Sequence, residues 1–335
     1  MLLSKLDTDR LYARRCDAVK QPLESGVILS PTGPTIDRAA LSQCAMRGRH
    51  LLEAEYKAVS ASPHPMRPIN AALLQLVSSD SGWTALTIRL NEQICGGEDS
   101  WAQVWTAEVY HAGGYQLGTV VIKLLAEALF WSHWSGKTWT TAAEAEKAEL
   151  QAYRILSCLQ GREVPHCYGG FPFVVPWGET VTGIILEDLS QVSVPLFTFC
   201  PPLLHHGGED VDKLEAVRPL LEAAFSTLHR LQALGITCYD FSPNDILILF
   251  PTSTSPMRLV FLDFGETIAA TEFAAEHAEL NVKHDGKLGP WQNEDEWTLR
   301  EMIFQYFPEG TSRWIRATPE ERGMDLYDDI DPELE

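Results

Sequence analysis

The sequence predicts an α+β protein, in which a five-stranded antiparallel sheet with one inserted helix precedes a mainly helical second domain. Three observations predict this class: a series of β-branched segments separated by turn residues, one long amphipathic helix, and a short hairpin behind that helix. With 335 residues and 45% hydrophobic content, the chain can bury a core of one large or two modest domains.

The predicted sheet comes first along the chain. Turn residues such as Gly96 and Gly97 separate runs rich in Val, Ile and Thr, which is the pattern of half-buried strands. The five strands are expected at residues 87–94, 102–110, 118–125, 166–171 and 181–186. A helix over residues 142–159 is inserted between the third and the fourth of them.

The second domain is predicted to begin near Ser190 with a proline-rich link. Leucines at helical spacing then predict an amphipathic helix over residues 210–234, which Gly235 ends and Pro219 is expected to kink or open. This helix delivers the chain to Asp240. The apolar runs 246–250 and 259–262 follow, separated by a Pro/Ser/Thr turn, and predict a hairpin.

Four units follow from these patterns. Residues 1–85 form an extension whose role the sequence does not reveal, with a helix expected over residues 37–59 behind the cap Thr35. The remaining units are the sheet domain at 86–189, the reduced helical domain at 190–316 and an acidic tail at 317–335.

Charge and composition limit the classes of partner. The formal net charge of −20 disfavours nucleic acid and favours basic partners. No run of about 18 apolar residues predicts a membrane span, and no basic start followed by an apolar stretch predicts a secretory signal. The seven cysteines are scattered without a Cys-x-x-Cys pair, so we expect reduced thiols in a cytoplasmic or nuclear protein that is not secreted.

Two charges lie where the pattern predicts burial. Lys123 ends the run Val120-Val-Ile-Lys123 of a central strand, where an unpaired ammonium would be costly. Glu149 shares the inward face of the following helix with Tyr153 and Leu156. We expect the two to form an ion pair, with a phosphate as second anion for the lysine. In the alternative, Lys123 snorkels from a strand edge and Glu149 is solvated.

Three carboxylates accompany the hairpin in a fixed order. Asp240 and Asp245 lie five residues apart at the turn before it, and Asp263 ends its second strand in Asp263-Phe264-Gly265. Each alone is typical of ordinary turn chemistry. The order and spacing of all three together distinguish this segment from an ordinary turn.

Together these motifs resemble the protein kinase-like superfamily, and most of all its divergent fungal members, over residues 87–307. Val120-Val-Ile-Lys123 resembles the family's Val-Ala-Ile-Lys strand, and Glu149 resembles its helix glutamate. Cys238-Tyr-Asp240 stands where the family has His-Arg-Asp, and Asp263-Phe-Gly265 resembles its metal-binding triplet. The resemblance implies a two-lobed kinase-like fold with a reduced helical C-lobe.

The resemblance also implies ATP and Mg²⁺ as cofactors and a role for each motif. Asp240 and Lys123 would be catalytic, with Asp240 orienting the attacking hydroxyl and Lys123 gripping the α- and β-phosphates.

The remaining site residues bind the nucleotide or its metal by the same resemblance. The metal ligands would be Asp245 and Asp263, and Glu149 would hold Lys123 in place. The backbone at Gly96 and Gly97 would approach phosphate, while Glu187 and Leu189 would form the hinge that holds adenine.

Departures from the family pattern leave three functions open. Asp245 replaces the family's asparagine, Glu98 and Asp99 make the phosphate loop acidic, and the usual Ala-Pro-Glu segment is absent. The leading hypothesis is an ATP-dependent phosphotransferase acting on a hydroxyl of an unknown acceptor, such as a protein Ser or Thr. The alternatives are a pseudokinase that serves as a nucleotide-binding or interaction scaffold, and a small-molecule kinase of the aminoglycoside or choline type.

Overall fold

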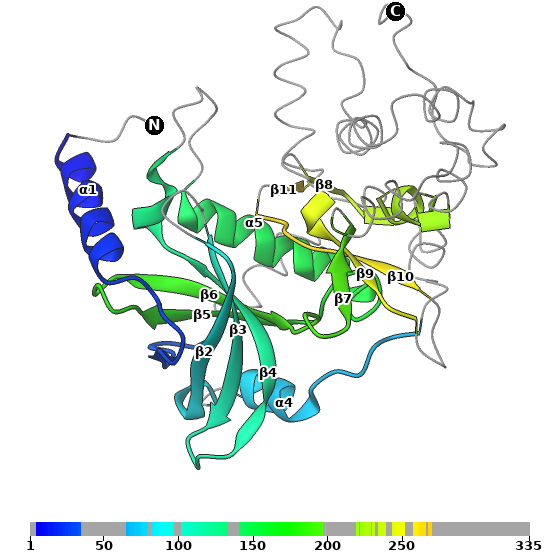
Figure 1. Cartoon of the computed structure of the whole chain (residues 1–335), viewed down its shortest axis with the longest axis horizontal. Helices are drawn as coiled ribbons and strands as arrows, with labels where there is room; N and C mark the ends of the chain where they lie inside the picture. The colour runs from blue at the N-terminus through cyan, green and yellow to red at the C-terminus, as the bar shows by residue number, and fades with distance from the viewer. Residues whose placement is uncertain are drawn as a thin grey trace, which may run out of the picture.

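A computed structural model gives the arrangement of the chain (Figure 1). It describes residues 5–34, 65–79, 82–96, 102–132, 141–196, 198, 219–220, 222–228, 230–231, 234–238, 243–251, 257–265 and 267–269. The expected helix at 37–59 and the acidic tail at 317–335 lie outside these residues. None of the helices within them is both long and apolar enough to cross a bilayer.

The main sheet is antiparallel and has six strands in the order β1-β2-β3-β4-β6-β5. Five of them match the predicted segments: β2 (Leu86–Cys95), β3 (Ala102–His111), β4 (Gln116–Leu125), β5 (Cys167–Val174) and β6 (Thr180–Glu187). The prediction of five strands was therefore wrong by one. The sixth, β1 (Ile28–Leu29), comes from the N-terminal extension and pairs with β2, and two residues are too few to show a strand's alternation.

Each face of this sheet has its own core. On β4, Val120, Ile122 and Leu124 join a cluster with Leu73 and Val77 of α4 (Ala71–Ser78). The alternate side chains point to the opposite face, where Leu125 packs with α5 (Ala142–Ile155). Figure 1 shows α5 running along one face of the sheet, with α4 beside β4. Lys123 therefore belongs to the face that α5 covers.

The helix α5 begins at the residue that the sequence predicts. Thr141 and Glu144 form a reciprocal capping box, in which each side chain accepts a hydrogen bond from the other residue's backbone N–H. The helix ends at Ile155 and continues as the short helix η3 (Leu156–Cys158). Its buried face carries Glu149 together with Ala145, Ala152 and Tyr153.

Several short elements surround this sheet. At the N-terminal side lie α1 (Lys5–Lys20) and the short helix η1 (Gly82–Ala85), and η2 (Glu127–Ser132) follows β4. The α1 helix packs against η2. The buried side chain of Ala18 brings α1 into the same core cluster as α4.

The second part of the chain contains the predicted hairpin. The strands β9 (Ile246–Leu249) and β10 (Arg258–Phe261) pair with Ile246 opposite Phe261, and β7 (Ser193–Pro195) adds to β9. The short helix η4 (Pro243–Asp245) leads into this hairpin. A separate pair joins β8 (Ile236–Cys238) to β11 (Thr267–Ala269).

The predicted long helix is described in part. Residues 222–228 are helical, and Ala224, Phe225 and Leu228 are fully buried. The prediction that Gly235 ends the helix is confirmed by its left-handed φ of 89°, which glycine adopts without a steric penalty. The beginning of this helix lies outside the described residues.

The loop after α5 connects the sheet to the second part. Glu163 is almost fully buried and pairs with Arg230 at 2.8 Å, while its carbonyl accepts a hydrogen bond from the Phe261 N–H at 2.8 Å. One apolar cluster also spans both parts, from Tyr153 of α5 to Leu228 and Phe261. The position of α5 is therefore tied to the position of β10.

Gly183 of β6 provides a test of the packing of this sheet. A Cβ at this position would lie 2.6 Å from Cε2 of Phe173 and 2.9 Å from Cδ1 of Ile122. We expect Gly183→Ala to lower the free energy of unfolding by about 1–3 kcal/mol through overpacking, as measured by urea denaturation. Gly113→Ala, whose nearest new contact is 3.4 Å away, is the matched control. Equal stabilities of the two variants would contradict the packing of β5 on β6.

Candidate functional site

The site is built around the ammonium of Lys123 on β4. Cross-strand register places Lys123 between Val104 of β3 and Ile184 of β6, in the centre of the sheet. Its side chain is 9% exposed, and its Nζ lies 2.9 Å from Oε2 of Glu149 and 2.5 Å from Oδ1 of Asp263. A buried ammonium is therefore neutralised by two carboxylates from different elements.

Glu149 is the buried partner. Its side chain is 0% exposed, and α5 directs it toward the sheet, as its helical spacing with Tyr153 predicts. The expected ion pair is confirmed. The alternative, in which Lys123 snorkels and Glu149 is solvated, is wrong because both side chains lie inside the protein.

Asp263 is the accessible partner. Its side chain is 51% exposed, while Oδ1 of its carboxylate faces Lys123. The backbone at Asp263 has a φ of 53°, a left-handed conformation that is uncommon for a residue other than glycine. The Gly265 N–H donates to Oδ1 at 3.2 Å.

Gly265 lies close to the charged cluster. A Cβ at this position would lie 3.4 Å from Oδ1 of Asp263, 3.6 Å from Nζ of Lys123 and 3.7 Å from Oε2 of Glu149. The glycine backbone thus passes directly beside all three charged groups.

The charges in this cluster shift one another's pKa. Burial raises the pKa of Glu149 to about 7, since the opposing charge of Lys123 does not offset desolvation and the charges of Asp263 and Asp245 add to the rise. Burial alone would raise the pKa of Asp263, but the charge and hydrogen bond of Lys123 lower it below its ordinary value. Burial alone would lower the pKa of Lys123, but the two carboxylates outweigh it and raise that pKa.

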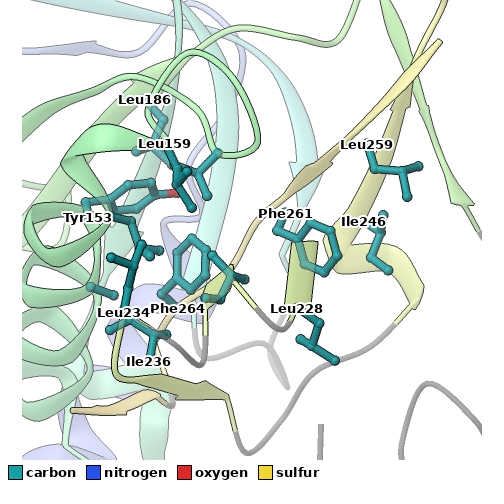
Figure 2. Close-up of a cluster of buried hydrophobic side chains, with 14 of the residues drawn as sticks. Tyr153, Leu159, Leu186, Leu228, Leu234, Ile236, Ile246, Leu259, Phe261 and Phe264 are labelled. Carbon is teal, nitrogen blue, oxygen red and sulfur yellow. The ribbon is translucent and has the colours of Figure 1, made fainter. Parts of the chain in front are cut away.

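An aromatic contact holds the Asp263 turn against α5. Phe264 is 1% exposed and meets Tyr153 edge to face, with ring centroids 5.3 Å apart. Figure 2 shows these two rings side by side, with Phe261 and Leu228 in the same cluster. Because Phe264 adjoins Asp263, this packing fixes the carboxylate beside Lys123.

Asp245 lies at the same end of the hairpin as Asp263. Phe261 pairs with Ile246, and the Leu262 N–H donates to the carbonyl of Asp245 at 2.7 Å. The two predicted metal ligands are thus brought together by the β9–β10 register. Among the described residues, no group of three or more His, Cys, Asp or Glu side chains is placed to hold a metal ion.

The predicted hinge follows β6. The carbonyl of Leu189 accepts hydrogen bonds from the Val192 N–H at 3.1 Å and from Oγ of Ser193 at 2.8 Å. Both lone pairs of this carbonyl are therefore engaged within the protein, so a nucleotide base at the predicted hinge would have to hydrogen-bond to the backbone N–H of Leu189. The Glu187 N–H donates to the carbonyl of His166 at 2.9 Å.

Gly96 lies at the end of β2, where a side-chain bridge covers its backbone. Nε2 of Gln93 donates to Oε1 of Gln103 at 2.5 Å, and a Cβ at Gly96 would lie 2.1 Å from the first of these atoms and 2.4 Å from the second. A larger residue here would displace the ends of these two glutamine side chains. Gly97 and Asp240 lie outside the described residues, so their predicted roles stay predictions.

Arg67 is a residue of this region that the sequence patterns did not single out. Its Nε and Nη2 donate to the two carboxylate oxygens of Glu187 at 2.7 and 2.8 Å. The signal in the sequence is faint: an arginine followed by Pro68 in a segment without periodicity. Neither its burial nor its partner 120 residues away has a local pattern.

Comparisons with known proteins give similarity to solved structures alone. No family model matches the sequence, and no curated protein matches it. The chain is similar to crystal structures of the PknI kinase domain of Mycobacterium tuberculosis in a doubly and a singly substituted form. Identity is 12% in both, the TM-scores are 0.41 and 0.40, and the match covers 66% of this chain and 74% and 73% of the two domains.

The raised pKa of Glu149 predicts a pH-dependent stability. The carboxyl has an ordinary pKa of 4.5 and a pKa of about 7 in the folded protein. As pH rises, Glu149 therefore loses its proton at a lower pH in the unfolded chain than in the folded protein. The wild type should therefore lose stability relative to Glu149→Gln between pH 5 and 7, by at most about 3 kcal/mol, since one pH unit corresponds to about 1.4 kcal/mol.

Urea denaturation at pH 5 and pH 7.5 measures this difference. Glu92→Gln, which removes an exposed carboxylate on β2, is the matched control for net charge. A difference between wild type and Glu149→Gln that stays constant over this range would show that Glu149 ionises in the folded protein with an ordinary pKa.

Proposed function

We propose that this protein is an ATP-dependent phosphotransferase of the protein kinase-like superfamily, which transfers the γ-phosphoryl group to a hydroxyl of its acceptor. One observation carries the proposal: a buried lysine is held between a buried glutamate and a half-exposed aspartate. A pair that served stability alone would need neither a second anion nor an open side.

Lys123 has the capacity to bind a phosphate in this position. An ammonium has three N–H donors: one is donated to Asp263, and even if the ion pair with Glu149 at 2.9 Å occupies a second, one is left. The third N–H can donate to a phosphate oxygen while Glu149 keeps the ammonium in place. Asp263 limits the approach to the side on which its carboxylate is exposed.

The donor set fits Mg²⁺. This ion is commonly held by one or two carboxylates together with phosphate oxygens and waters, so a cage of three protein ligands is not required. Asp263 supplies a carboxylate that is ionised at neutral pH because its pKa is lowered. Asp245 lies at the same end of the hairpin and supplies a second carboxylate. When bound, the ion neutralises charge between the β- and γ-phosphates.

Asp240 is the proposed base. It lies outside the described residues, and the resemblance of Cys238-Tyr-Asp240 to the family's His-Arg-Asp motif implies that its carboxylate orients the hydroxyl of the acceptor. That acceptor is a protein Ser or Thr, or a small molecule.

A pseudokinase scaffold is the second candidate, and Asp245 favours it. The negative charge of Asp245 contributes to raising the pKa of Glu149, so Asp245 adds negative charge to the cluster. Such a charge disfavours an incoming triphosphate unless a metal ion accompanies it. The two functions share the same site and differ in turnover.

Magnesium-dependent ATP binding is the first expected outcome. Free MgATP at about 100 times its dissociation constant should stabilise the wild type by about 2.7 kcal/mol, measured as a thermal shift with and without Mg²⁺. Asp263→Asn should lose this shift because it removes the accessible carboxylate. Asp17→Asn, which changes an exposed carboxylate on α1, is the matched control. A MgATP-dependent thermal shift in Asp263→Asn as large as in the wild type would refute the proposed role of Asp263 in the site.

Turnover separates the two candidate functions. Asp240→Asn should retain the MgATP-dependent shift but lose phosphoryl transfer by about 100-fold or more, since a positioned base contributes roughly 10²–10⁴. Release of ³²P-phosphate or autophosphorylation from labelled ATP measures it. If the wild type binds MgATP and transfers nothing above the Asp240 variant, the scaffold function is the correct one.

A further inference from the structure

Residues 65–70, which we call the strap, come from the N-terminal extension and lie across the loop after α5. The Arg67 N–H donates to the carbonyl of Gly161 at 2.7 Å, and Nε2 of His166 donates to the carbonyl of Arg67 at 3.0 Å. Nη1 and Nη2 of Arg67 donate to the carbonyls of Arg162 and Val164 at 2.7 and 3.0 Å. The strap thus holds this loop through both backbone and side chain.

The same guanidinium holds the end of β6. Arg67 meets both carboxylate oxygens of Glu187 in a bidentate pair, with side-chain exposures of only 8% and 13%. The His166 N–H is a further donor to Oε2 of Glu187 at 3.0 Å. Four of the five N–H groups of Arg67 are engaged in this way, a geometry that a lysine cannot reproduce.

The strap also reaches the second part of the chain. Nη1 of Arg258, at the start of β10, donates to the carbonyl of Pro65 at 2.8 Å. The strand β10 leads directly to Asp263. Through Pro65 and Arg67 the strap therefore contacts the loop that follows α5, the end of β6 and the start of β10.

These elements carry or adjoin the proposed site. In the β4–β6 register, Lys123 is opposite Ile184 and Glu187 is opposite Val120, so the strap fixes β6 three residues from the level of Lys123. At about 3.3 Å per residue this is roughly 10 Å, a separation suited to a nucleotide's base and phosphates. Asp188 and Leu189 follow Glu187 directly.

We propose that Arg67 is a positioning residue for nucleotide binding: it fixes the Glu187–Leu189 segment and the loop after α5 relative to Lys123. This proposal rests on the proposed function for its nucleotide, while the fixing of the segment is a property of the protein alone. Arg67 acts through Glu187 and does not itself contact the proposed ligand.

The test compares Arg67→Lys and Arg67→Ala with the wild type in two measurements. Hydrogen exchange without nucleotide should become at least about tenfold faster in peptides covering residues 159–166 and 183–193, because local opening costs less when the clamp is lost. Calorimetric titration with MgATP should give about tenfold weaker binding, since small displacements of positioned groups have large effects. Lysine keeps the charge and should not restore either property.

Val109→Ala is the matched control for a general loss of stability. Val109 is fully buried at the end of β3 far from Lys123, where it pairs with Ile88 and Gly118. It should lower the melting temperature without changing exchange at 183–193 or MgATP affinity at temperatures where the protein is folded. Equal effects of Val109→Ala and Arg67→Lys on affinity would overturn the proposal.

The two proposals fail in different ways. A wild type that binds no MgATP contradicts the proposed function, while faster exchange confined to the two peptides in Arg67→Lys would still support the positioning role. Unchanged exchange in both Arg67 variants overturns the positioning role, whatever the wild type binds. If Arg67→Ala does not fold, Arg67→Lys and Glu187→Gln carry the same comparison.

Discussion

The burial of one ammonium determines how the parts of this protein meet. Lys123 is placed in the middle of the sheet, where it is stable only with anions beside it, and the two anions come from α5 and from the residue after β10. The helix, the hairpin and the sheet are therefore coupled through a single charged group. Displacing any of them would leave a buried charge without its partner, which costs several kcal/mol. The packing of Phe264 on Tyr153 supports the same arrangement with apolar contacts.

Arg67 is subject to the same constraint at the loop after α5. It is a second cation that burial forces into contact with an anion, Glu187, and with two backbone carbonyls, those of Arg162 and Val164. The two cations differ in how exposed the side chains of their carboxylate partners are. Glu187 is enclosed on both oxygens, as expected of a structural clamp, whereas Asp263 keeps half of its side chain exposed. That contrast is the physical reason to assign binding to one pair and positioning to the other.

The parts of this arrangement that the sequence predicts are those with local patterns. β-Branched runs locate the five longer strands. A buried Lys123 needs an anion, and helical spacing places the carboxylate of Glu149 on the same inward face as Tyr153, so the sequence identifies Glu149 as the partner. The sixth strand has two residues and therefore no period. Arg67 could not be found either, since its contacts join segments 95–120 residues apart in an irregular stretch. Long-range polar contacts of single residues depend on tertiary packing, which no local pattern encodes.

The two carboxylates that contact Lys123 differ in exposure: Glu149 is enclosed and the side chain of Asp263 is half exposed. Glu149 is wholly enclosed, and its pKa is raised first by burial and then by the negative charges of Asp263 and Asp245. Asp263 and Asp245 lie toward the open end of the hairpin, and keeping both ionised beside Glu149 costs free energy in the protein alone. A cation between these two carboxylates would relieve that cost, and it would do so without disturbing the Lys123–Glu149 pair. The charge distribution therefore favours binding of a metal together with its anion over binding of a bare triphosphate.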